Sequence, residues 1–136
     1  MTGDFRYFDI SAFPIVAIRG SDLPAGYAPQ WIAEMDLLVG QPEPFAFVFL
    51  DSAENPTHED QKAQTLWLKQ NKAQLAAVCR GAVSVEPDLA KRLLKRAQAL
   101  AITVAFGLRF AVASNRPEAE NRARRLLAGE TVDDTE

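Results

Sequence analysis

The stretch Phe-Ala-Phe-Val-Phe-Leu, residues 45–50, decides the fold, because all of its side chains are apolar. A strand that is covered on only one face alternates apolar and polar residues, whereas an unbroken apolar run is typical of a strand buried on both faces of a parallel sheet. A shorter apolar run occurs at residues 14–18, mainly apolar segments occur at residues 82–85 and 108–113, and a weaker, alternating run occurs at residues 5–10. We therefore expect one sheet in which residues 45–50 lie centrally and residues 5–10 form an edge strand.

The segments between these runs have the spacing and the end signals of helices. The first helix is predicted to begin at residue 27 or 29 and to end at residue 38, before Gly40. A longer helix is predicted over residues 57–78, with Thr57 as its N-cap and Gly81 beyond its end. Pro87 opens a helix over residues 88–106, and the last helix follows a capping-box pattern at Asn115 and ends near residue 129.

The resulting order is β-β-α-β-α-β-α-β-α. This alternation predicts an α/β fold with a mostly parallel sheet of about five strands, right-handed crossovers and helices packed on the sheet. The first two strands can pair antiparallel at one edge. A chain of 136 residues is near the commonest size of a single domain, so we expect one domain over residues 1–129 and an acidic, disordered tail over residues 130–136.

Composition excludes several classes of protein. The net charge of −3 disfavours a nucleic-acid binder and electrostatic docking on a membrane. A single cysteine and a single histidine exclude an intrachain disulfide and a Cys/His zinc site. The first residues lack the pattern of a signal peptide, and no apolar run approaches the ~20 residues of a membrane span. We expect a cytoplasmic protein with no cofactor, no metal, no nucleic-acid partner and no membrane insertion.

The order and lengths of these segments over residues 5–128 resemble STAS domains, in particular their sporulation anti-sigma-factor-antagonist-like branch. Classical members carry a Ser or Thr that is phosphorylated at the start of the helix after the central strand. Here the matching stretch is Asn-Pro-Thr-His-Glu, residues 55–59, in which Thr57 takes the place of the acceptor and the family's Ser-Gly step is absent. The adjacent Glu59 and Asp60 would repel a phosphate. The resemblance implies a non-enzymatic regulatory or protein-interaction module.

A second hypothesis is a small-molecule or lipid-binding protein, or a minor enzyme, that uses the loops after residues 45–50 and 82–85. In open α/β sheets, ligands bind at the carboxyl ends of the strands. His58 with a nearby carboxylate would make a general base or a weak metal site, although helix-capping preferences explain the same residue types. The candidate ligand-binding residues are Asp51, Ser52, Thr57, His58 and Glu86.

Two groups of residues are candidates for binding a protein partner or a second copy of the chain. They are a pair of neighbouring residues and a basic cluster. Trp67 lies beside two leucines and has no obvious inward place, so an exposed pair with Leu66 would be a hot spot. On the helix over residues 88–106, we expect the stripe that contains Leu89 and Leu93 to face the core. The basic cluster would then lie on the outer side, as a partner site or as a solvated face. The candidate partner-binding residues are Leu66, Trp67, Lys91, Arg92 and Lys95.

Overall fold

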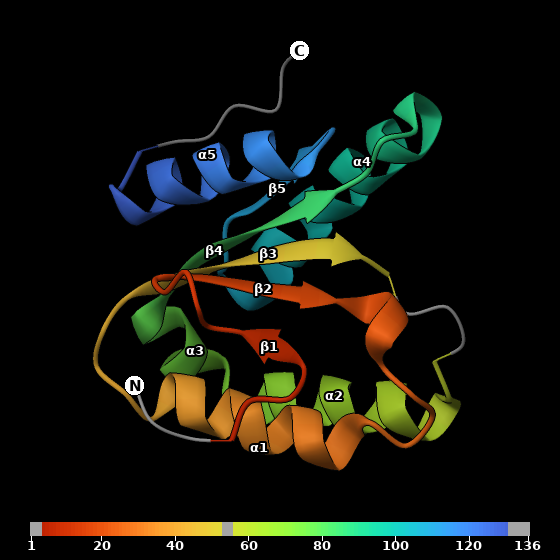
Figure 1. Cartoon of the computed structure of the whole chain (residues 1–136), viewed down its shortest axis with the longest axis vertical. Coiled ribbons are helices and arrows are strands. Elements are labelled where there is room, and N and C mark those ends of the chain that lie inside the picture. Colours follow the sequence, from red (N-terminus) through yellow and green to blue (C-terminus); the bar gives the residue numbers. More distant parts are fainter. Residues whose placement is uncertain (1–3, 53–55, 131–136) are drawn as a thin grey trace.

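A computed structural model describes residues 4–52 and 56–130 and contains one five-stranded sheet (Figure 1). The strands lie side by side in the order β1-β2-β3-β4-β5. Strand β1 pairs antiparallel with β2, and the other three pairings are parallel. The strands span Phe8–Asp9 (β1), Ile15–Arg19 (β2), Phe45–Asp51 (β3), Cys79–Val85 (β4) and Phe110–Ala113 (β5). The prediction of an α/β fold with a mostly parallel sheet is confirmed.

The helices cover both faces of the sheet. Helices α1, α2 and α3 contribute to one core with β2 and β3, whereas α5 packs on the opposite face against β3, β4 and β5. Helix α4 connects β4 to β5 and contacts β5; in Figure 1 it runs from behind the strands to the upper right of the view. Their bounds are Ala28–Val39 (α1), His58–Gln70 (α2), Lys72–Val78 (α3), Leu89–Phe106 (α4) and Arg116–Leu127 (α5), and a short 3-10 turn covers Gly20–Asp22 (η1).

The two cores differ in side-chain size. The face under α1 to α3 is aromatic and includes Trp31, Phe45 and Phe47. The face under α5 is made mainly of small residues, with Ala111 on β5 and Ala119 on α5 both buried. Small residues on both sides let a helix backbone approach a sheet closely, so α5 is tightly seated. The aromatic face is the side of the sheet on which an apolar chamber lies.

Several boundaries differ from the predictions. The helix expected over residues 57–78 is interrupted at Asn71, so α2 and α3 are separate helices, and the element order contains one helix more than predicted. Gly81 does not end a helix but lies inside β4 with φ of +142°. A Cβ there would lie 2.6 Å from the Arg109 carbonyl oxygen, so the close pairing with β5 requires glycine. The predicted tail spans residues 130–136. The structure describes Glu130, and residues 131–136 lie outside the described residues.

Candidate functional site

Asp51 and Ser52 lie at the carboxyl end of β3, as predicted, and line a groove over the aromatic face of the sheet. The Asp51 carboxylate accepts hydrogen bonds from the Ser21 backbone N–H and hydroxyl, both at 2.8 Å. Its Oδ2 also lies 3.7 Å from Arg19 Nη1. Asp51 therefore holds the η1 turn against the end of β3, and its charge is already balanced.

Thr57 is the N-cap of α2, as expected, since its Oγ1 accepts from the Asp60 N–H at 3.0 Å. His58 lies on the outer side of α2, in a surface depression that it shares with Leu66 and Lys69. The structure thus does not bring His58 into the groove that Asp51 and Ser52 line. Among residues 4–52 and 56–130, no three His, Cys, Asp or Glu side chains are grouped so that they could hold a metal ion.

Asp60 is a buried carboxylate whose role the sequence did not reveal. It accepts hydrogen bonds from the Gly26 N–H at 2.8 Å, the Ala28 N–H at 3.0 Å and the Thr57 hydroxyl at 2.7 Å. The Thr57 hydroxyl and these backbone N–H groups, against the opposing effect of burial, hold the pKa of Asp60 below its usual value. Asp60 therefore joins the start of α2 to the start of α1, and the Thr-x-x-Asp spacing was its only local signal.

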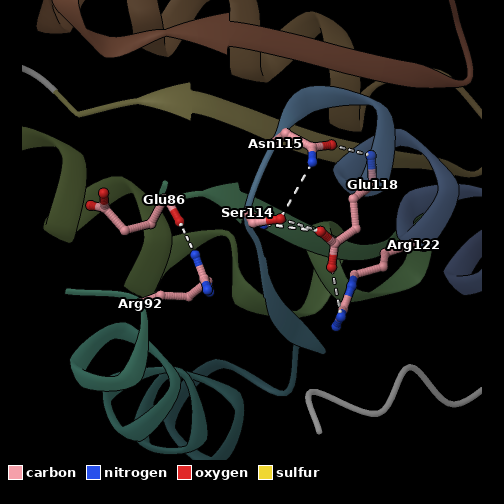
Figure 2. A network of polar contacts seen from close by, with 6 residues as sticks. All are labelled: Glu86, Arg92, Ser114, Asn115, Glu118 and Arg122. Carbon is pink, nitrogen blue, oxygen red and sulfur yellow. Dashed lines mark hydrogen bonds and ion pairs between the residues drawn. The ribbon is translucent and has the colours of Figure 1, made fainter. Parts of the chain in front are cut away.

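Glu86 follows β4 and is engaged in a contact with α4. Its Oε1 lies 3.2 Å from Lys95 Nζ. Burial acts to raise the pKa of Glu86, but the Asp88 N–H and the Lys95 ammonium outweigh it, and the pKa lies below the usual value. Arg92 Nη1 donates to the Glu86 carbonyl oxygen at 3.0 Å and to the Pro87 carbonyl oxygen at 3.1 Å, the first of which Figure 2 shows.

The orientation of α4 is opposite to the prediction. Arg92 is only 8% exposed and faces the end of β4 together with Lys95, whereas Lys91 is exposed. The buried position in the middle of the helix is Ala99. The large apolar side chains of α4 face outward, and those that are more than half exposed are Leu89, Leu93, Leu94, Leu100 and Val104. The expectation that the leucine stripe would pack inward is wrong.

The predicted hot spot of Leu66 and Trp67 is also corrected. Leu66 is 53% exposed, but Trp67 is 5% exposed and belongs to the core. Its indole Nε1 donates to Asp36 Oδ1 at 2.9 Å, and its ring meets Trp31 edge-on with centroids 5.7 Å apart. Trp67 fits into the core because α1 supplies Trp31 as an aromatic neighbour and Asp36 as a hydrogen-bond acceptor.

The start of α5 carries a second polar network, which Figure 2 shows. Asn115 Oδ1 accepts from the Glu118 N–H at 2.9 Å, which confirms the predicted N-cap. The Glu118 carboxylate accepts from the Ser114 hydroxyl and N–H and from Arg122 Nη2, the last at 2.9 Å. These contacts order the loop after β5, and the polar groups of the network hydrogen-bond to one another.

The groove itself lies between α2 and α4. An apolar chamber of about 300 Å³ is lined by Phe47, Phe49 and Phe110 from the sheet and by Ile102 from α4. An adjoining, more polar cavity of about 440 Å³ opens at the carboxyl ends of the strands. Sequence analysis missed the three phenylalanines as site residues, because apolar residues on strands indicate a core and not a cavity.

Comparison of the chain with protein-family models, with curated proteins and with solved structures finds no significant match. No helix among the residues that the structure describes is both long enough and apolar enough to cross a membrane. The groove and the outward face of α4 are therefore the candidate functional surfaces.

Proposed function

We propose that this chain is a non-enzymatic interaction module that self-associates through the outward face of α4. The observation that carries the proposal is the exposure of that face: Leu100 is 73% exposed and Val104 is 84% exposed. A continuous apolar stripe on one helix is typical of a surface that another molecule covers. The regulatory role comes from the resemblance of the element order to STAS domains, and it remains part of the proposal, as does the cytoplasmic location.

The stripe has the spacing of a helix–helix seam. Its residues follow one another at intervals of three and four, which is the periodicity of knobs-into-holes packing. It contains both small and large side chains, so the stripe offers both holes and knobs. The seam consists of Ala90, Leu93, Ala97, Leu100 and Val104.

A second copy of the chain fits this seam best in an antiparallel arrangement. If two α4 helices cross at Ala97, Leu93 of one copy lies opposite Ala101 of the other, and Val104 lies opposite Ala90. The same pairing is repeated by two-fold symmetry, as an isologous dimer requires. In these two pairs a large side chain meets a small one, whereas Leu100 lies opposite Leu94. All six positions are exposed in the single chain.

The charge distribution along α4 favours the antiparallel pair over a parallel one. The four basic residues of the helix lie between residues 91 and 96, and residues 97–106 carry no charge. A parallel pair would place the two basic halves together, whereas an antiparallel pair places each beside a neutral half. A membrane surface is a poorer occupant, because Arg92 and Lys95 face the protein and do not form a basic rim around the leucines.

The size of the face predicts a reversible dimer. A helix of 18 residues is about 27 Å long, and a single helix pair covers less than the roughly 1,200 Å² that standard interfaces bury in total. We therefore expect self-association with a dissociation constant in the micromolar range. The interface is centred on α4, and the groove on its other side stays open.

Sedimentation equilibrium of Leu93→Glu tests this proposal, and Leu66→Glu is the matched control. Both leucines are 53% exposed and both lie on helices, so the two substitutions introduce the same charge at equally exposed helical positions. We expect Leu93→Glu to raise the dissociation constant at least tenfold and Leu66→Glu to leave it unchanged. A monomeric parent chain, equal effects of the two substitutions, or α4-dependent binding of the monomer to anionic vesicles would overturn the proposal.

A further inference from the structure

We infer that the groove between α2 and α4 binds a neutral, flat aromatic molecule that carries a hydrogen-bonding group at one end. This inference goes beyond self-association, because it uses the side of α4 that faces the sheet. In the view of Figure 1, α2 lies below the strands and α4 reaches above them. The lining residues show that the space between them is a cavity, reaching from Leu68 on α2 to Ile102 on α4.

The floor of the groove is a row of stacked aromatic rings. The rings of Phe47 and Phe49 have centroids 5.6 Å apart and planes at 16°, and those of Phe49 and Phe110 have centroids 6.0 Å apart and planes at 29°. Phe49 and Phe110 are only partly buried, so part of each side chain remains accessible. Because rings stacked in this way cover part of each other's faces, they offer the chamber their edges and the remaining parts of their faces. Another aromatic ring packs favourably against these edges and faces, edge-to-face or offset-stacked.

The inner chamber supplies the apolar environment. Its volume of about 300 Å³ is at the lower end of the range for small-molecule sites. Among the described residues that line it, Gln64 is the one polar side chain. The Tyr27 hydroxyl donates to Gln64 Oε1, which orients the amide and leaves its NH₂ as the donor. The chamber therefore combines a large apolar surface with one oriented polar group.

The mouth of the groove selects against a charged ligand. It contains amide and hydroxyl groups from Gln61, Gln98 and Ser84. Its two charged side chains already have partners, since Asp51 pairs with Arg19 and Lys95 pairs with Glu86 at 3.2 Å. An ionised ligand would lose its hydration without gaining a counter-charge, which is costly. A neutral molecule avoids this cost and can still bond to the amides.

Two fluorescent probes with the same ring system test the inference on the whole chain. N-phenyl-1-naphthylamine is neutral, and 1-anilinonaphthalene-8-sulfonate adds a sulfonate to the same rings. We expect the neutral probe to bind saturably, with one site per chain, and the sulfonate to bind at least tenfold more weakly. Absence of saturable binding, or equal affinity for the two probes, would overturn the inference.

Two substitutions locate the site. Ile102→Trp fills the chamber and should weaken binding of the neutral probe at least tenfold, whereas Leu66→Trp, on the outer side of α2, should leave it unchanged. If Ile102→Trp fails to fold, as judged by circular dichroism, Gln98→Trp at the exposed mouth takes its place with the same expectation. Leu93→Glu should not change probe binding. A loss of binding in Leu93→Glu would place the probe on the outward leucines and refute the groove, without bearing on whether α4 dimerises.

Discussion

Glu34 offers the sharpest test of what holds the N-terminal segment on the domain. Its carboxylate on α1 is 0% exposed. It accepts hydrogen bonds from the backbone N–H of Tyr7 at 3.0 Å and of Phe8 at 2.9 Å, and from Gln30 Nε2 at 2.9 Å. Strand β1 has only two residues, so the carboxylate replaces much of the pairing that a longer strand would have. The substitution Glu34→Leu removes all three acceptor contacts and keeps the volume.

The magnitude follows from the two backbone donors. A buried donor that loses its partner costs about 1–3 kcal/mol, and two of them cost about 4 kcal/mol. Removing a buried carboxylate also relieves its desolvation, which offsets part of the loss. We therefore expect Glu34→Leu to lower the free energy of unfolding by about 3 kcal/mol, which corresponds to a fall in Tm of roughly 10 °C for a domain of this size. Glu34→Gln, which keeps one oxygen, should lose about half as much.

Urea unfolding followed by circular dichroism measures these differences. Glu43→Leu is the control, because Glu43 is an exposed carboxylate in the loop before β3, and we expect its effect to stay within about 0.5 kcal/mol. The order of destabilisation should be Glu34→Leu, then Glu34→Gln, then Glu43→Leu. A loss below about 1 kcal/mol for Glu34→Leu would show that the bonds to Tyr7 and Phe8 do not hold the segment.

Two further predictions concern other buried contacts. Trp67→Phe keeps an aromatic ring but removes the hydrogen bond to Asp36, so it should lower the free energy of unfolding by about 1 kcal/mol. Trp67→Ala should lower it by about 3–5 kcal/mol. A Trp67→Ala variant as stable as the parent in urea unfolding would contradict the placement of Trp67 in the core. Because the pKa of folded Asp60 lies below its usual value of 3.8, its carboxylate stabilises the fold fully above that value, and this stabilisation is lost as the pH falls through the folded pKa. The stability difference between the parent and Asp60→Asn should therefore be constant above about pH 5 and shrink in acid, and a difference that does not change with pH would refute the role assigned to Asp60.

Local sequence signals identified most of the elements. The apolar run at residues 45–50 is the core of β3, which continues to Asp51, and Thr57 and Asn115 are the N-caps that their residue types indicate. These features depend on contacts within a few residues. They can therefore be read from the chain without knowing what lies across the sheet. The same local reading failed at Gly81, where the carbonyl oxygen of Arg109, the residue before β5, and not a helix end, requires glycine.

The sequence by itself determined the strands, the helices, their α/β alternation and the existence of an amphipathic stripe on α4. Only the tertiary structure decided which side of α4 faces the sheet, because that depends on the Glu86 and Pro87 carbonyl oxygens that bind Arg92. Likewise, Trp67 is buried because α1 brings Asp36 to its indole. Periodicity shows that a helix has two unlike faces, but contacts with groups outside the helix, which only the folded chain brings together, determine which face is covered. For this reason the groove floor and the outward leucines became candidate surfaces only once the strands and helices were placed together.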